Sequence, residues 1–573
     1  MIKKKPLAVT ASLVCLFALS NCKGGGSSGG MISVDPLSVE ELGGNFNKDY
    51  LPDKSNIQQR SGTVNVCLDF EGTAPGWKAV ANEYMRLQSN QVTVNIDDTL
   101  SGKQYADKLN SELNNPSTTS WDICEGNLGY GKTRTACINL FDKFKQKNYY
   151  CGANKKWNEV VDEIAYKSSS SDTSGETFIV NSENMQSCWF INDVAFQKAV
   201  EKGYKTESGL EAYPETWNDL INLCKYMKEA GYTNPLGISL ESISVESLQF
   251  TWLLRIYGDY YYRQFYSYIQ KSSEEEPEWE GYDPTDTEPE TRDGYNAQPA
   301  KYLNILFNEN VSSQCSLVDW AGFQSDLYKD FVGNLAKMNG YLMQNSESTA
   351  LSTARDNFRM QNSGKSSPQI LLDYEGFGLK FKKNETESFK LGMFDYPTMK
   401  SDYVDGDTIT RDIGGNGGFI SIINHVGETE HNNLTTDFVE FFLSPYGQTI
   451  YYKGLAANDV NPKGLTTVNN DLVGISDEWK NYFTECEEAG VKFNGLVDPN
   501  PFISFGVRYC NGYPKTQAII VSNWQKLIVT KQMDVDNFCS TWAEACTEDM
   551  KSICATNKWK TPDVYENFWY PIE

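Results

Sequence analysis

The sequence predicts an α/β fold with more than one unit. The chain has 573 residues, of which 40% are apolar and 13% aromatic, a profile too rich in apolar side chains for a wholly disordered protein. Between residues 63 and 124, strand-like and helix-like patterns alternate with short connections. This alternation favours parallel strands in a sheet that lies between helices.

The first unit begins with a strand at residues 63–70, where apolar residues lead into a Gly/Pro loop. A helix at 77–88, a strand at 91–96, a helix at 104–113 and a strand at 121–124 are expected to follow. In parallel sheets, ligands bind at the carboxyl ends of the strands. The loops at Asp69 and Glu125 should therefore share one rim.

A second unit follows a Ser-rich loop. A strand is expected at 188–193 and a helix at 194–202, and Thr216 should cap a further helix that stops at Gly231. The stretch 272–296 is acidic and broken by prolines, which predicts an exposed loop. Whether this loop binds a cation stays open.

The N-terminus carries an export signal. Three lysines at 3–5 precede an apolar run at 7–19, which is too short to span a bilayer of about 30 Å. The run ends in Leu-Ser-Asn-Cys22, which resembles a bacterial lipobox. We expect a lipoprotein signal peptide at 1–21, lipidation at Cys22, a flexible tether at 22–61 and an extracytoplasmic, lipid-anchored location on a bacterial membrane. The alternatives are a plain secretory peptide or a chance cysteine.

Charge and composition exclude several classes of function. The chain has 76 acidic and 51 basic residues, a net charge of −25, which argues against nucleic acid as a partner. Only two histidines occur, so a His₃ zinc site cannot form within one chain. We expect no cofactor and no metal.

The cysteines leave two interpretations open. Twelve of the fourteen lie beyond the signal peptide and Cys22, and an extracytoplasmic location would permit disulfides among them. Local bridges could join Cys137 to Cys151 and two of the three cysteines 539, 546 and 554. The three cysteines 539, 546 and 554 could instead be buried thiols.

Four passages carry a resemblance to a known family. They are the helix at 77–88, the pair 189–193 and 214–217, the stretch 230–239, and the glycine-rich turn at 414–422 leading into 438–447. In order and spacing they resemble bacterial extracellular solute-binding proteins of the sugar-binding family 1 type, which are similar to maltose-binding protein.

The resemblance implies a periplasmic-binding-protein-like fold, in which two α/β lobes are joined by a hinge with a cleft between them. Lobe one would hold residues 62–177 and 397–446, and lobe two would hold 178–396 and 447–573. The implied function is a monomeric, non-enzymatic receptor that closes on a small-molecule ligand, a mono- or oligosaccharide by this resemblance, and delivers it to an ABC permease.

The same resemblance suggests the ligand-binding residues. A sugar needs aromatic platforms for its C–H faces and carboxylates or amides for its hydroxyls. The candidates are Asp69, Glu71, Trp77, Glu125, Asn127, Trp252, Tyr374, Glu375, Gly415 and Asn416.

Most of these candidates have a structural alternative. Trp77 and Trp252 could be core residues, Asp69 could cap a turn, and the glycines could serve only the backbone. Tyr374 and Glu375 form the favoured pair, because an apolar strand ends there in an aromatic residue and a carboxylate.

Two other functions remain open at this stage. The many acidic residues could supply the carboxylate pair of an extracellular carbohydrate-active enzyme, although neither a G-x-S-x-G nor an H-E-x-x-H motif occurs. A surface lipoprotein could also keep the two-lobed fold and act as an adhesin.

Overall fold

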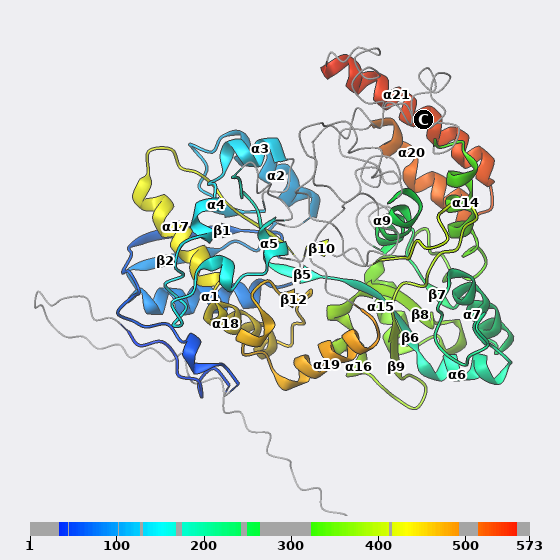
Figure 1. Cartoon of the computed structure of the whole chain (residues 1–573), viewed down its shortest axis with the longest axis horizontal. Coiled ribbons are helices and arrows are strands. Elements are labelled where there is room, and N and C mark those ends of the chain that lie inside the picture. Colours follow the sequence, from blue (N-terminus) through cyan, green and yellow to red (C-terminus); the bar gives the residue numbers. More distant parts are fainter. Residues whose placement is uncertain are drawn as a thin grey trace, which may run out of the picture.

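The computed structural model describes residues 34–43, 45–70, 72–100, 102–125, 130–167, 175–241, 249–263, 322–411, 415–416, 418–491 and 514–557. Two groups of helices and strands lie on either side of a small central sheet (Figure 1). We call the group around the five-stranded sheet lobe one and the group around the four-stranded sheet lobe two. The predicted α/β, two-lobed architecture is confirmed.

Lobe one is built on five strands in the order β2-β1-β3-β11-β4. They are β1 (Gly62–Cys67), β2 (Val92–Ile96), β3 (Ile123–Cys124), β4 (Val180–Asn181) and β11 (Phe419–Ile422). β1 pairs in parallel with β2 and β3, as the alternating pattern predicted. β11 runs antiparallel to β3 and β4, so a distant part of the chain completes this sheet.

The helices of lobe one include α1 (Ala74–Leu87), α2 (Gly102–Asn114), α3 (Tyr130–Ala136), α4 (Phe141–Phe144), α5 (Glu163–Lys167), α17 (Thr429–Phe442) and α18 (Pro445–Ala457). α1 packs along α18. A Cβ atom at Gly454 would lie 2.5 Å from the Cβ of Ala79, so the absence of a side chain at Gly454 permits this close approach.

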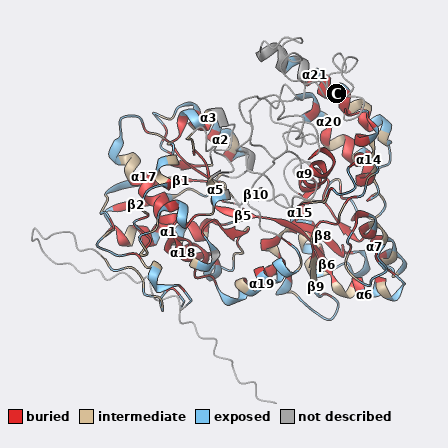
Figure 2. Cartoon of the chain, viewed as in Figure 1, coloured by how far each residue is buried: buried red, intermediate tan, exposed pale blue. Residues whose placement is uncertain are grey.

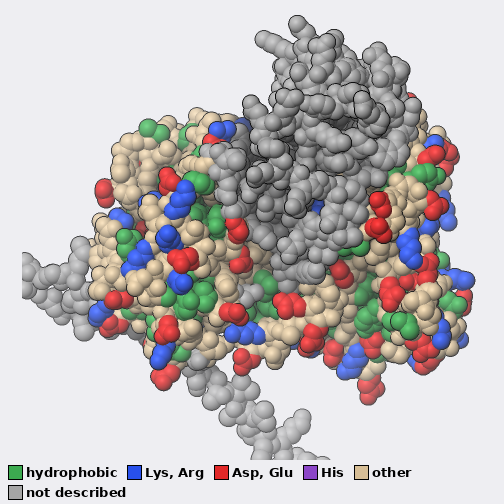
Figure 3. Space-filling view, viewed as in Figure 1, with side chains coloured by type: hydrophobic (Ala, Val, Ile, Leu, Met, Phe, Trp, Pro, Cys, Tyr) green, Lys and Arg blue, Asp and Glu red, His purple; other side chains and the backbone are tan. Residues whose placement is uncertain are grey.

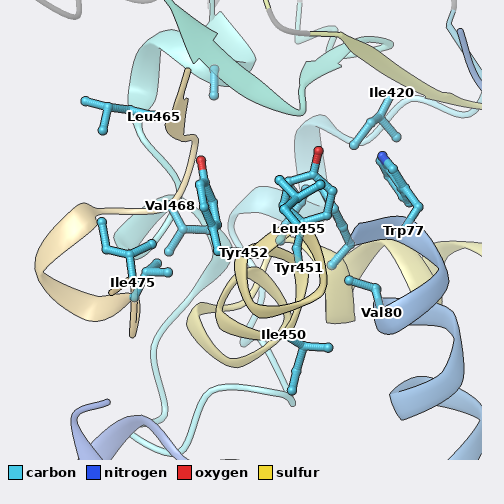
Figure 4. Close-up of a cluster of buried hydrophobic side chains, with 14 of the residues drawn as sticks. Trp77, Val80, Ile420, Ile450, Tyr451, Tyr452, Leu455, Leu465, Val468 and Ile475 are labelled. Atoms are coloured by element: carbon cyan, nitrogen blue, oxygen red, sulfur yellow. The ribbon is translucent and has the colours of Figure 1, made fainter. Parts of the chain in front are cut away.

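Trp77, on α1, lies at one side of this buried cluster, next to Tyr451 of α18 (Figure 4). Its ring stacks on Phe442 with centroids 4.1 Å apart and meets the edges of Phe70 and Tyr451. Only 3% of Trp77 is exposed. The core alternative that the sequence left open therefore accounts for this residue.

Lobe two contains four strands in the order β7-β8-β6-β9. They are β6 (Ser187–Asn192), β7 (Leu236–Gly237), β8 (Ile370–Tyr374) and β9 (Leu391–Phe394). In β6, Trp189 and Ile191 join one apolar core, while Cys188 and Phe190 join the other. Both faces of the sheet are buried, which explains the uninterrupted apolar run in the sequence (Figure 2).

The helices around this sheet include α6 (Asp193–Glu201), α7 (Trp217–Glu229), α9 (Gln249–Tyr262), α14 (Asp326–Ala336), α15 (Leu351–Met360), α16 (Gly378–Lys382), α20 (Pro514–Trp524) and α21 (Val535–Asn557). The predicted cap of α7 is confirmed. The Thr216 hydroxyl accepts the N–H of Asp219 at 3.1 Å, and the Asp219 carboxylate accepts the N–H of Thr216 at 2.9 Å.

The central sheet contains β5 (Glu183–Met185), β10 (Gly415–Asn416) and β12 (Leu465–Thr466), in the order β10-β5-β12. β5 follows β4 of lobe one and precedes β6 of lobe two. β10 lies between a lobe-two segment and β11 of lobe one. The chain also returns after β12 to α19 (Asp477–Glu488), whose Tyr482 hydroxyl donates to the carbonyl of Glu375. These crossings form the hinge.

The observed contacts place the lobe boundaries at other residues than the sequence predicted. Thr398 bridges to Thr216, and Arg411 pairs with Asp259 of α9, so residues 397–411 pack with lobe two and not with lobe one. β4 and α18 belong to lobe one, although they were expected in lobe two. The local pattern could not reveal these non-local pairings.

The structure corrects the expected tether over residues 34–61. Leu42, Phe46 and Ile57 are buried, and Phe46 packs edge-on against Tyr446. The Tyr446 hydroxyl also accepts the N–H of Leu37 at 2.8 Å. A few apolar anchors thus hold this polar segment against lobe one.

The expected local disulfides are also corrected. Cys137 and Cys151 are both free thiols, and they belong to different apolar clusters. Cys539 and Cys546 are likewise free and buried. The buried-thiol alternative therefore describes Cys539 and Cys546, and the expected bridge between Cys137 and Cys151 is not formed.

Several expectations lie outside the described residues. They concern the signal peptide 1–21, Cys22, the tether up to residue 33, the acidic loop 272–296, Glu71, Asn127, and the side chains of Asn416 and Cys554. Among the described residues, no helix combines the length and apolarity needed to cross a membrane. On the face shown in Figure 3, acidic and basic side chains are interspersed over the described surface.

Candidate functional site

The lobe-one side of the candidate site is the edge at which β1 and β3 end. The Tyr105 hydroxyl donates to the carbonyl of Cys67 at 2.7 Å and accepts the N–H of Glu125 at 2.9 Å. Its ring stacks on Trp121, with centroids 5.6 Å apart. Tyr105 thereby fixes the two strand ends beside each other, and the predicted rim shared by Asp69 and Glu125 is confirmed.

The glycine-rich turn approaches the same edge. A Cβ atom placed on Gly418 would lie 2.7 Å from Ser182 Oγ and 3.4 Å from Glu125 Oε1. Gly415 and Asn416 form β10, opposite Met185 and Asn184 of β5. The lobe-one rim therefore continues into the hinge sheet.

The lobe-two side is the end of β8. Tyr374 lies opposite Ser187, the first residue of β6, so it faces the connection that leads back to the hinge. The ring of Trp252 meets Tyr374 edge-on at 5.8 Å, and the Arg255 guanidinium lies 4.9 Å from the Trp252 ring. Trp252 is 3% exposed and belongs to the lobe-two core, so the core alternative accounts for this residue as well, and Tyr374 is the half-buried aromatic candidate that packs on it.

Glu375 is fully buried at this side of the hinge. Its Oε2 accepts the N–H of Gln186 at 2.7 Å, and its own N–H donates to the Gln186 carbonyl at 3.0 Å. Burial raises the pKa of the Glu375 carboxyl well above its usual range. Its Oε1 has no hydrogen-bond partner.

Glu183, on β5, is a second buried carboxyl in the hinge. Its Oε2 accepts the N–H groups of Lys463 at 2.6 Å and Gly464 at 3.0 Å, and Oε1 accepts the Tyr451 hydroxyl. Burial raises the pKa of Glu183. Through these bonds β5 is tied to the segment that precedes β12.

Unpartnered polar atoms concentrate at the crossing from lobe one to lobe two. In the described part of the chain, fourteen buried side-chain nitrogen or oxygen atoms lack a hydrogen-bond partner, and seven of them lie between Thr177 and Trp189. Both amide atoms of Asn181 and both of Gln186 are in this group, and both side chains are fully buried. Since buried amides are normally hydrogen-bonded, this arrangement suits a ligand or bound water.

The sequence prediction missed these amides and Tyr105. Residues 181–186 are polar except for Met185 and immediately precede the apolar strand β6. That polar run was the available signal, but it has the composition of an exposed loop. Its burial depends on β10 and β12, which come from much later in the chain.

Comparison with solved structures supports the architecture. The chain is similar to the chitin oligosaccharide binding protein, with 13% identity over 86% of this chain and 99% of that one and a TM-score of 0.52. It is also similar to the raffinose-bound solute-binding protein RafE, with 13% identity, coverage of 86% and 100%, and a TM-score of 0.53. The chain therefore shares the fold of these two carbohydrate-binding proteins.

A third protein with this fold is the cyclic alpha-maltosyl-1,6-maltose binding protein from Arthrobacter globiformis. It shows 13% identity over 86% of this chain and all of that one, with a TM-score of 0.50. No protein-family model and no curated protein sequence matches the chain. The likeness therefore rests on the fold.

Proposed function

We propose that the chain is an extracytoplasmic receptor that binds a carbohydrate between its lobes and delivers it to an ABC permease. Proteins with the same fold are described as binding chitin oligosaccharide and cyclic maltosyl-maltose, and another was solved with raffinose. These ligands share rings of hydroxyl groups. A site for such a ligand must supply many hydrogen-bonding groups.

The observation that carries this proposal is the pair of buried, unpartnered amides, Asn181 and Gln186. Each amide offers both a donor and an acceptor, which matches the two roles of a sugar hydroxyl. Asn181 ends β4 of lobe one, and Gln186 directly precedes β6 of lobe two. A ligand that pairs with both amides would therefore contact the crossing itself.

Candidates from the sequence extend this site on both sides. Asp69 and Glu125 lie at the lobe-one rim, and Tyr374 and Trp252 form an aromatic pair at the lobe-two edge. We propose that the carboxylates bind hydroxyls and that Tyr374 stacks on the sugar ring. Glu71, Asn127, Gly415 and Asn416 remain predicted members of the lobe-one rim, and Glu375 remains one at the hinge.

Trp77 is left out of the proposed site. Its ring contacts are made with Phe70, Phe442 and Tyr451 inside the lobe-one core. A sugar platform needs an accessible face, and 3% exposure of Trp77 provides none.

Function then follows from a shift between open and closed forms. A ligand that contacts both lobes binds the closed form more strongly and shifts the population toward it. The permease would recognise the closed form. This cycle requires no covalent chemistry, and the protein is proposed to act as a monomer, anchored by lipid at Cys22.

Isothermal titration of the purified chain with a panel of mono- and oligosaccharides tests this proposal. We expect stoichiometric binding of at least one sugar without its hydrolysis. Sugar turnover, or the absence of binding across the panel, would contradict the proposal.

Asn181→Leu provides a sharper test. Because the amide has no partner in the protein, replacing it with an apolar side chain of similar size should leave unfolding stability unchanged or higher. Two lost hydrogen bonds at about 0.5–1.5 kcal/mol each should weaken sugar binding roughly tenfold. The matched control is Asn523→Leu in α20, since Asn523 is also buried with an unpartnered amide nitrogen. This control should bind sugar like the wild type.

A further inference from the structure

Both histidines of the chain converge on one carboxylate. His425 Nε2 lies 2.8 Å from Asp122 Oδ1, and His431 Nε2 lies 2.7 Å from the same oxygen. The two imidazole rings are perpendicular, with centroids 4.8 Å apart. Two histidines cannot form a His₃ site, but two imidazoles and a carboxylate form a different ligand set.

The cluster lies at the end of the lobe-one strands that is opposite the proposed sugar site. Asp122 immediately precedes β3, whereas the rim residue Glu125 immediately follows it. His425 comes after the end of β11, which runs antiparallel to β3. His431 lies in the first turn of α17. The three side chains thus join three segments at the opposite end of the strands.

The surrounding hydrogen bonds hold Asp122 in place. Its Oδ2 accepts the N–H of Asn65 at 2.7 Å, and its own N–H donates to the Asn65 carbonyl at 3.0 Å. Its carbonyl accepts the N–H of Ile423 at 2.9 Å. Oδ1 is therefore the carboxylate oxygen that faces the two imidazoles.

The loop that carries His425 is held as well. The Asn432 side chain accepts the N–H of His425 at 3.1 Å and donates to the His425 carbonyl at 3.0 Å. Asn432 lies one residue after His431, so the two histidine backbones are linked through it. Such outer contacts are what orients the ligands of a metal site.

We propose that Asp122, His425 and His431 bind one Zn²⁺ ion. Imidazole and carboxylate ligands suit zinc, whereas Ca²⁺ and Mg²⁺ prefer oxygen ligands alone. The candidate ligand atoms all lie within 4.8 Å of one another. Bonds of about 2.0–2.1 Å at tetrahedral angles separate ligand atoms by about 3.3 Å, so the imidazole nitrogens would move about half an ångström away from Asp122 Oδ1.

The fourth position of the ion would be open to water. The side chain of His431 is 27% exposed, while those of His425 and Asp122 are 9% and 2% exposed. Bound Zn²⁺ would link the start of β3, the loop after β11 and the start of α17. It would stabilise lobe one independently of the sugar site.

Metal titration of the full chain tests the proposal. The protein is prepared without a polyhistidine tag, stripped with a chelator and kept in a phosphine reductant. We expect about one equivalent of Zn²⁺ to bind and to raise the melting temperature, and Mg²⁺ at the same concentration to have no effect. Co²⁺ should give the visible absorption of a site with nitrogen and oxygen ligands.

Variants identify the ligands. His431→Gln and His425→Gln should each weaken Zn²⁺ binding by more than about tenfold. The control is Glu428→Gln, since Glu428 is exposed in the same loop and is not a proposed ligand. It should bind Zn²⁺ like the wild type. The proposal would be overturned if the wild type did not bind Zn²⁺. It would also be overturned if both histidine variants bound Zn²⁺ as strongly as the wild type. Sugar binding by His431→Gln is expected to be unchanged, so this test is independent of the proposed function.

Discussion

Replacement of Trp77 by alanine distinguishes a core residue from a sugar platform. The substitution removes a ring that stacks on Phe442 at 4.1 Å and contacts Phe70 and Tyr451. Truncation of a buried tryptophan costs about 3–5 kcal/mol, and an aromatic pair accounts for about 0.5–1.5 kcal/mol of such a loss. Domains are stable by only about 5–15 kcal/mol, so lobe one should lose a large part of its stability.

The loss should be visible as a fall in melting temperature of about 6–20 °C, since 1 kcal/mol corresponds to roughly 2–4 °C in a unit of this size. Urea unfolding followed by circular dichroism gives the free energy, and calorimetric titration below the transition gives the sugar affinity. Tyr374→Ala is the comparison variant, because Tyr374 is half-buried and lies at the proposed site. Trp77→Ala should retain sugar affinity while folded, and Tyr374→Ala should lose it. Unchanged stability with lost affinity in Trp77→Ala would refute the core assignment.

Three further predictions concern buried polar groups. Burial raises the pKa of Glu440 to about 8, so its contribution to stability is present at acidic pH and is lost as pH rises toward 8; Glu440→Gln should flatten the pH profile of urea unfolding by up to about 1.4 kcal/mol per pH unit. Asp259→Ala leaves Arg263 and Arg411 buried without their carboxylate and should cost about 3–5 kcal/mol in urea unfolding. Tyr105→Phe removes the bridge between the strand ends and should cost about 1–3 kcal/mol and weaken sugar binding in calorimetry.

Each of these predictions can be contradicted directly. Parallel pH profiles for Glu440→Gln and the wild type would show that this carboxyl is ionised in the folded protein at neutral pH. Wild-type stability in Asp259→Ala would mean that water compensates the two guanidinium groups. Unaltered sugar affinity in Tyr105→Phe would place the ligand away from the lobe-one rim.

Local sequence patterns were sufficient where local contacts decide the structure. The periodicity at 77–88 predicted most of α1, and Thr216 predicted the start of α7, because helix faces and caps are set by residues a few positions apart. The parallel order of β1, β2 and β3 followed from the short connections between them.

The remaining features depend on distant partners. The polar run around Asn184 is buried only because β10 and β12 pair with it. Phe46 packs in lobe one because Tyr446, four hundred residues later, provides the contact. Trp77 shows why the site residues could not all be predicted from the sequence. A tryptophan at the start of a helix has the same sequence pattern whether it faces a ligand or Phe442.

The pairing of β3 with β11 determines when lobe one can fold. Cys124 lies opposite Ser421, so the sheet has an exposed edge until the C-terminal part of the chain is available. At synthesis rates of about 5–20 residues per second, the nascent chain waits some tens of seconds for that partner. During that interval the lobe-one sheet cannot be completed. Neither lobe can be obtained by cutting the chain at a single point.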